Sequence, residues 1–217
     1  RVFERAMREF KIPYVPVGGR KFYEHREIRD ILAFIRLLVN PSDDAAFLRI
    51  INVPARGIGV KTVAKIRAEA ANRGESLYKT ARSMAGGGTR SAKALNGFTR
   101  MMDQLATSAR TVHPAQLVGL VLQDTGYLEE LEQLAGKNDE SRGGFNKEKS
   151  DARRRLSNLQ LLIREAQNLE EEEALSPIEL LQSWMDRMCL AGQDDKIPEE
   201  GQVALMTVHN SKGLEYP

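Results

Sequence analysis

Residues 54–66 read PARGIGVKTVAKI, a stretch that joins two helical segments through Gly57-Ile58-Gly59. Pro54 ends the preceding helix, and Gly57 and Gly59 allow a tight turn, because glycine accepts positive φ or a close backbone approach. Ile58, between the two glycines, is expected to fill the space between the helices on either side. The stretch therefore predicts two short helices joined by a glycine turn.

The backbone amides of this turn are suited to hold a phosphate. The amides of Gly59, Val60 and Lys61 come at the start of the following helix, where unpaired N–H groups and the positive end of the helix dipole favour an anion. Lys61 adds a charge, Thr62 adds a hydroxyl, and Arg56 is expected to flank the anion. The turn resembles a helix-hairpin-helix motif, which binds the DNA backbone without reading bases. The alternative is an ordinary connection between two helices with a glycine cap.

Basic residues are concentrated in the half of the chain that contains this turn. Residues 1–73 have 15 Lys and Arg against 8 Asp and Glu, and residues 74–122 have 6 against 2. Residues 123–200 have 10 against 19, so the net charge of +2 hides a basic half and an acidic half. Clustered cations attract polyanions over about 8 to 10 Å. The pattern favours a nucleic acid as partner of the basic half, with solvated helix faces as the alternative.

The spacing of apolar residues predicts a mainly helical protein. Residues 203–209, VALMTVH, have the continuous apolar character of a buried parallel strand, and residues 14–19 form a short extended segment. Two such pieces do not make a stable sheet alone, so we expect a helical insertion bracketed by parts of an α/β domain that continues beyond both ends. The expected helices are 1–10, 27–39, 45–52, 60–72, 91–109, 114–124, 153–173 and 177–190.

Composition excludes several other classes of protein. Of 217 residues, 41% are hydrophobic and 29% charged, which is typical of a globular chain rather than a disordered one. The single Cys189 and three histidines make neither an internal disulfide nor a structural zinc site. The sequence contains no apolar run of about 18 residues and no signal-peptide core, so we expect a cytoplasmic protein that does not bind a membrane.

A polar turn follows the predicted strand at 203–209. Hydroxyl, imidazole and lysine groups at the carboxyl end of a strand are well placed for phosphates, because open α/β sheets bind ligands at that edge. The spacing alone equally fits a charged surface loop. Lys212 and Gly213 are not part of a phosphate loop, because the earlier glycines of GxxxxGK are absent.

Three stretches resemble, in the same order, signatures of the UvrD/Rep/PcrA group of superfamily 1 DNA helicases. They are VGGRKFYEHREIRDILAFIRLL at 17–38, INVPARGIGVKT at 51–62 and MTVHNSKGLEYP at 206–217, the last being similar to motif V of that group. His25 departs from the pattern, which has Arg or Lys at this position, and this departure weakens any DNA contact there.

The resemblance implies a division of the chain and a role for each part. Residues 1–18 and 201–217 would belong to the RecA-like motor domain called 2A, and residues 19–200 would form the inserted helical domain called 2B. In the family, the glycine turn contacts duplex DNA, and motif V contacts single-stranded DNA and the nucleotide. The implied DNA-binding residues are Arg56, Gly57, Ile58, Gly59, Lys61, Thr62, Thr207, His209, Ser211 and Lys212, and the implied nucleotide contacts are Gly213 and Glu215.

The resemblance also implies an enzyme as the parent protein. That parent would couple hydrolysis of ATP, with Mg²⁺, to 3′→5′ movement on DNA in repair or replication. The chain itself has no phosphate loop, so we expect no catalytic residue, metal, cofactor or ATPase activity in it. We expect it to bind duplex or junction DNA without sequence preference and to regulate unwinding. The alternatives are a helical module that docks repair or replication proteins or holds the motor autoinhibited, and the equivalent part of a RecB- or AddA-type nuclease-helicase.

Overall fold

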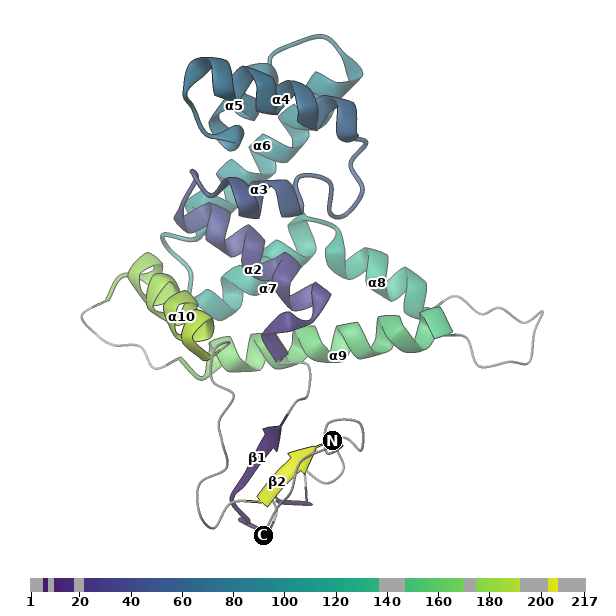
Figure 1. Ribbon diagram of the computed structural model, residues 1–217, viewed down its shortest axis with the longest axis vertical. Helices are drawn as coiled ribbons and strands as arrows, with labels where there is room; N and C mark the ends of the chain where they lie inside the picture. The colour runs from purple at the N-terminus through teal and green to yellow at the C-terminus, as the bar shows by residue number, and fades with distance from the viewer. Residues whose placement is uncertain are drawn as a thin grey trace, which may run out of the picture. The chain divides into compact units, whose positions relative to one another are not determined.

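The computed structural model describes residues 6–7, 10–17, 22–136, 147–169, 175–191 and 203–206. Contacts divide the chain into two units: Arg1–His25 together with Arg187–Pro217, and Arg26–Asp186. The described strands belong to the first unit and most of the described helices to the second (Figure 1). None of the described helices is long and apolar enough to cross a membrane.

The first unit contains a pair of parallel strands, β1 at Tyr14–Val17 and β2 at Val203–Met206, with the short 3₁₀ helix η1 at Phe22–Glu24. Tyr14 pairs with Val203 and Val17 with Met206, so the register has no bulge. Parallel strands need a crossover connection, and here the helical unit lies between them in the chain. Residues 207–209 of the predicted strand lie outside the described residues.

The chain is mainly helical, as predicted from the apolar spacing. The described α-helices are α2 (Arg26–Val39), α3 (Asp44–Ile50), α4 (Val60–Arg73), α5 (Leu77–Met84), α6 (Arg90–Ser108), α7 (Pro114–Asp124), α8 (Tyr127–Gly136), α9 (Lys147–Gln167) and α10 (Pro177–Ala191).

Two of these helices were not predicted, and one was predicted in the wrong place. The α5 helix has only eight residues and starts where the Ser76 hydroxyl accepts a hydrogen bond from the Lys79 amide, at 3.3 Å. The α8 helix follows α7 after a corner in which Gly126 has a φ of 76°. The α9 helix spans Lys147–Gln167 rather than 153–173, because the Lys- and Glu-rich start of this segment is a good helix former.

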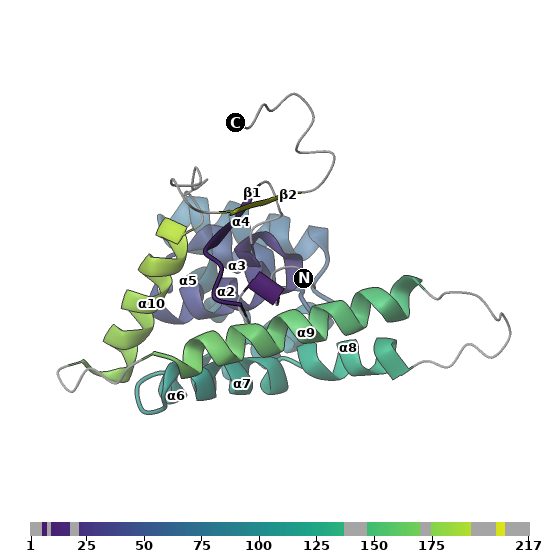
Figure 2. The ribbon, with the colours of Figure 1, turned by 90° about the horizontal axis from the view of Figure 1, so that it is seen from below.

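The core of the second unit is built around α2. Four apolar side chains on one face of α2 have no exposed surface: Ile28, Ile31, Phe34 and Ile35. This helix packs against α3, α6, α7 and α9, and α8 lies beside α9 in both views (Figures 1 and 2). Phe47, Tyr78 and Phe98 form an aromatic cluster with ring centroids 6.0 to 6.4 Å apart, which joins α3, α5 and α6.

Candidate nucleic-acid interface

The predicted glycine turn lies in the loop between α3 and α4. The α3 helix starts at a side-chain cap, where Asp43 Oδ1 accepts a hydrogen bond from the Ala46 amide at 2.9 Å. After α3, Asn52 organises the loop: its Oδ1 accepts from the Arg56 amide at 2.7 Å and from the Ile58 amide at 3.2 Å. The loop from Ile51 to Gly59 is therefore held by a side chain of its own.

Gly57 and Gly59 have different backbone conformations, and only that of Gly57 requires a glycine. Gly57 has a φ of 75°, a conformation that side chains other than glycine rarely adopt. Gly59 is extended, with a φ of −85°, and is the N-cap residue of α4. A Cβ atom built on either glycine meets no heavy atom within 4 Å. The turn formed by Gly57, Ile58 and Gly59, called the GIG turn below, therefore has an open outer side.

The amides at the start of α4 lie on that open side. The Gly59 carbonyl accepts the first helical hydrogen bonds, from Thr62 at 2.9 Å and from Val63 at 3.2 Å. Within the described part of the chain, the amides of Gly59, Val60 and Lys61 have no hydrogen-bond acceptor, and no side chain caps the helix. Val60 is 87% exposed. The sequence-based prediction required unpaired amides at this point, and the geometry has them.

The surroundings of these amides are basic. Lys61 and Lys65 are exposed, lie one turn apart on α4, and make no ion pair among the described residues. The first turn of α4 contains no acidic residue. Residues 57–100 include only two acidic residues, and both are paired: Glu69 with Arg73 at 2.6 Å and Glu75 with Lys79 at 2.9 Å. Within residues 57–100, an anion approaching the GIG turn therefore meets exposed lysines and no unpaired carboxylate.

Ile58 and Thr62 are less accessible than the other predicted contacts. Ile58 is 2% exposed, so it fills the interior beneath the turn, as expected for a plug, and offers no surface to DNA. Thr62 is half-buried in the first turn of α4. Among the described residues of the predicted site, Gly57, Gly59 and Lys61 are exposed, and Thr62 is accessible in part.

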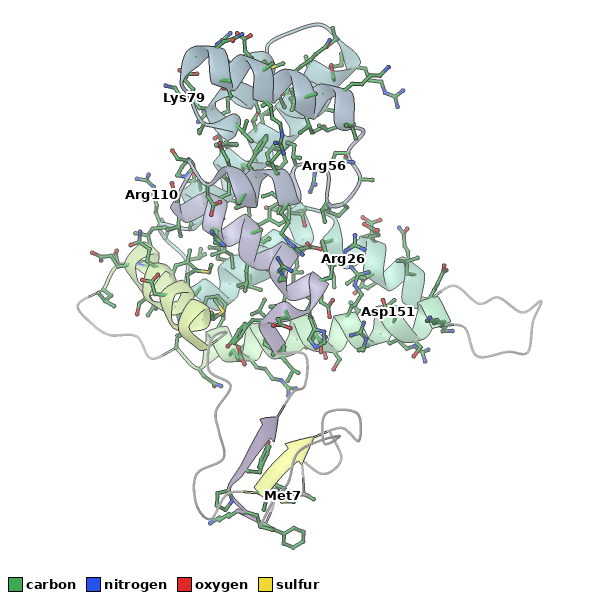
Figure 3. The ribbon with its side chains drawn as sticks, viewed as in Figure 1. Met7, Arg26, Arg56, Lys79, Arg110 and Asp151 are labelled. Carbon is green, nitrogen blue, oxygen red and sulfur yellow. The ribbon has the colours of Figure 1, made fainter. Side chains whose placement is uncertain are left out.

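Arg56 is not where the sequence analysis placed it. Its guanidinium points into the protein, where Nη1 donates to the carbonyls of Val53 at 2.6 Å and Pro54 at 3.0 Å and, more weakly, of Ile50 at 3.4 Å. Nη2 donates to the carbonyl of Thr125 at 3.2 Å. Figure 3 labels the Arg56 side chain in the loop between α3 and α4. With both Nη atoms bonded to carbonyls inside the protein, the structure gives Arg56 an internal role, which corrects the predicted flanking position.

The remaining predicted contacts lie outside the described residues, and no geometry is assigned to them. They are Thr207, His209, Ser211 and Lys212 for DNA, and Gly213 and Glu215 for the nucleotide. The structure describes this segment only up to the end of β2 at Met206. Among the described residues, no group of three or more His, Cys, Asp or Glu side chains is arranged to hold a metal ion.

Sequence reasoning missed a buried polar network centred on α2. Glu27 and Asp30 on α2 are acidic residues that are only 1% and 2% exposed. Asp30 Oδ1 pairs with Arg49 at 2.7 Å, and Asp30 Oδ2 accepts from the Tyr127 hydroxyl at 2.9 Å. The network continues to α9, where the Asn158 amide donates to Glu27 Oε1 at 2.6 Å.

A signal for this network was present in the sequence. Glu27 and Asp30 are three residues apart and therefore lie on one face of α2. That face is the apolar one, which also carries Ile31 and Phe34. Two acidic residues on an apolar helix face indicate buried carboxylates with partners, because an unpaired buried charge is costly.

Comparison with known proteins places the chain in a family. A family model described as the UvrD-like helicase C-terminal domain matches residues 1–217. The chain is 35% identical over 235 residues to ATP-dependent DNA helicase UvrD1 of Mycobacterium tuberculosis strain H37Rv, and this match covers 100% of the chain and 29% of the relative.

Two further relatives show the same coverage. DNA helicase II of Escherichia coli K12 is 33% identical over 227 residues, covering 100% of the chain and 29% of that protein. ATP-dependent DNA helicase PcrA of Staphylococcus epidermidis is 32% identical over 219 residues, covering 100% and 28%. The chain thus spans less than a third of the length of these curated relatives. With a family match over its full length, the chain belongs to the UvrD-like helicase C-terminal domain family.

Proposed function

We propose that the GIG turn and the start of α4 bind the phosphate backbone of duplex or junction DNA without reading its sequence. The observation that carries this proposal is the set of unpaired amides at Gly59, Val60 and Lys61, on an open surface with exposed lysines. Amides at a helix start and lysine side chains recognise phosphate oxygens, which are the same at every base pair. Binding through such groups carries no sequence information.

We further propose that this chain is part of an ATP-dependent 3′→5′ DNA helicase of repair or replication, in which the helical unit regulates unwinding. Relatives over its whole length are named ATP-dependent DNA helicases, which supports this reading. The β1–β2 pair supports it too, because parallel strands are stable mainly inside a larger sheet covered on both faces. The proposed division is a 2A motor domain at 1–18 and 201–217 and a 2B domain at 19–200.

ATP and Mg²⁺ are proposed only for the whole enzyme. The described residues offer neither a phosphate loop nor a cluster of carboxylates suited to Mg²⁺. Among the residues of this chain, Gly213 and Glu215 are the proposed nucleotide contacts. The chain alone is expected to have no ATPase activity, and DNA-stimulated ATP turnover by the isolated chain would contradict this assignment.

The proposal for the GIG turn is tested by titrating a fluorescently labelled duplex with the chain at low salt. Two duplexes of unrelated sequence are expected to bind with equal affinity. The logarithm of the association constant is expected to fall linearly with the logarithm of the salt concentration. Gly59→Asp places a carboxylate at the proposed phosphate position. The carboxylate repels the DNA phosphate, and the amides at the start of α4 no longer bind it. Because hydrogen bonds to charged groups contribute about 1.5 to 3 kcal/mol, affinity is expected to fall roughly tenfold to a hundredfold.

Gly136→Asp is the matched control, because it adds the same charge at an exposed glycine of α8 with open space around it. Its duplex affinity is expected to equal that of the unmodified chain. Circular dichroism of both variants checks that the helices are retained. Equal affinities of the two variants, or strong dependence on duplex sequence, would exclude the GIG turn as the DNA-binding element.

A protein-docking role is the second candidate, and one observation favours it. Three glutamates are exposed on α8, namely Glu129, Glu130 and Glu132, in the acidic half of the chain. Such a surface attracts a basic protein partner and repels DNA. Absence of duplex binding by the unmodified chain at low salt would favour this candidate, either in a helicase or in a RecB- or AddA-type nuclease-helicase.

A further inference from the structure

We infer that Arg56 is a positioning residue that holds the GIG turn against the corner between α7 and α8, and is not itself a phosphate contact. The inferred effect of Arg56 on DNA binding rests on the function proposed above, whereas its effect on the structure of the loop is independent of that function. The inference follows from where the guanidinium lies and from what it joins.

The guanidinium binds the carbonyl ends of two different helices. Ile50 is the last residue of α3, and Val53 and Pro54 follow it in the loop; the carbonyls of all three accept from Arg56 Nη1. Thr125 is the residue that caps the end of α7, and its carbonyl accepts from Nη2. A cation at the carbonyl ends of two helices satisfies groups that helices leave unpaired and complements both helix dipoles.

Aromatic rings complete the environment of this charge. The guanidinium carbon lies 5.7 Å from the centroid of the Phe34 ring and 5.8 Å from that of Phe98. Burial lowers the pKa of Arg56 to about 10, partly offset by the charge of Glu130, so the side chain stays protonated at neutral pH. The cation is thus held inside the protein by carbonyl groups and ring faces.

The corner between α7 and α8, whose Thr125 carbonyl accepts from Arg56, is held by hydrogen bonds of its own. The Thr125 hydroxyl donates to the Val121 carbonyl at 2.6 Å, and it accepts from the Tyr127 amide at 3.3 Å. Tyr127 in turn donates to Asp30 and accepts from Arg155 at 2.8 Å. Arg56 therefore fastens the loop to a part of the core that is itself held by hydrogen bonds.

The backbone of the same residue enters the turn. The Arg56 amide donates to Asn52 Oδ1, which also accepts from the amide of Ile58, and Gly57 lies between them. One residue thus joins the core through its side chain and the GIG turn through its backbone. Lysine cannot replace it, because a single ammonium has neither the planar fork that spans carbonyls on two sides nor the flat face that stacks on rings.

The inference is tested with Arg56→Lys and Arg56→Gln in the 217-residue chain, with Arg67→Lys as matched control. Arg67 is an exposed residue of α4, so the same substitution there removes no internal contact. Amide hydrogen exchange is measured over residues 51–61, and duplex affinity is measured across a series of salt concentrations. Cooperative thermal unfolding of each variant checks that the helical unit is folded.

In Arg56→Lys, the hydrogen-bonded loop amides of Val53, Arg56 and Ile58 are expected to exchange at least about tenfold faster, and the duplex is expected to bind about tenfold more weakly. Arg67→Lys is expected to leave both unchanged. In both Arg56→Lys and Arg56→Gln, the slope of log affinity against log salt concentration is expected to equal that of the unmodified chain, because no phosphate contact is lost. Loss of a contacting cation lowers that slope by about 1.

Three results would overturn the inference: unchanged loop exchange in Arg56→Lys, unchanged duplex affinity in a variant whose loop has loosened, or a slope lower by about 1 in Arg56→Gln. If the unmodified chain does not bind duplex DNA, the proposed function fails, and the exchange measurement alone decides whether Arg56 holds the loop. Failure of the proposed DNA binding is thus distinguished from failure of the positioning role of Arg56.

Discussion

Burial should decide how much a tyrosine–aspartate–arginine cluster contributes to the stability of the helical unit. The described residues include two such clusters, which differ in burial. The Asp30 side chain is 3% exposed and binds the Tyr127 hydroxyl at 2.9 Å and Arg49 at 2.7 Å. The Asp103 side chain is 47% exposed and binds the Tyr78 hydroxyl at 3.4 Å and Arg82 at 3.2 Å. The same substitution, aspartate to asparagine, therefore tests burial with the chemistry held constant.

The expected losses differ several-fold. Breaking a buried ion pair costs about 3 to 5 kcal/mol, because a charge is left without its partner. The lower end applies to Asp30→Asn, because the Arg49 side chain is 28% exposed and still reaches water. A loss of about 3 kcal/mol lowers the melting temperature of a unit of this size by roughly 6 to 12 °C. Asp103→Asn breaks an exposed pair that contributes about 0 to 1 kcal/mol, so its melting temperature falls by less than about 4 °C.

The assay is thermal unfolding followed by circular dichroism at pH 7 and physiological salt. The two variants and the unmodified chain are compared at one protein concentration, with reversibility checked by a second scan. Equal shifts in the two variants, or an unchanged melting temperature for Asp30→Asn, would refute the reasoning, since either result means that the α2 network does not stabilise the fold through burial.

Two further predictions concern the turn and the second cluster. Gly57→Ala is expected to lower stability by about 1 to 2 kcal/mol, because φ is positive there, whereas Gly59→Ala should change it by less than about 0.5 kcal/mol; urea unfolding of both variants checks the difference. Burial, followed by the charge of Asp103, raises the pKa of Tyr78 from 10.0 to about 12. The folded state therefore keeps a proton that the unfolded state releases, so this stabilisation is complete below pH 10 and is lost as the pH rises to 12. Ultraviolet titration of Tyr78→Phe should show one late-ionising tyrosine fewer than the unmodified chain, because burial also raises the pKa of Tyr127 and its late transition remains. A Tyr78→Phe curve with the same late amplitude as that of the unmodified chain would contradict the assignment.

The GIG turn could be predicted from local sequence. Its glycines, the proline before it and the apolar spacing of the next helix are all short-range signals, and they predicted the loop and the start of α4 at Val60. Ile58 could be assigned to the interior for the same reason, because it lies between two helices that must pack. Contacts with DNA stay predictions for Gly57, Gly59, Lys61 and Thr62, and for the segment that begins at Thr207.

The partners of the Arg56 and Asp30 side chains could not be predicted from local sequence. An arginine beside a glycine turn in a basic segment favours a phosphate contact, and nothing near it in the chain shows that the Thr125 carbonyl would be its partner. The acidic residues of α2 likewise meet Tyr127 and Asn158, far along the chain. The short helix α5 escaped prediction because eight residues give too few repeats of the apolar pattern.

The order of residues alone determined the mainly helical class, the glycine turn, the uneven distribution of charge and the helicase family, because each depends on spacing within a short window or on motif identity. Only the tertiary structure decided which cations face solvent and which face the core. The direction of a long side chain such as that of Arg56 depends on which carbonyls and rings the folded chain brings within its reach, and these come from helices that are distant in the sequence.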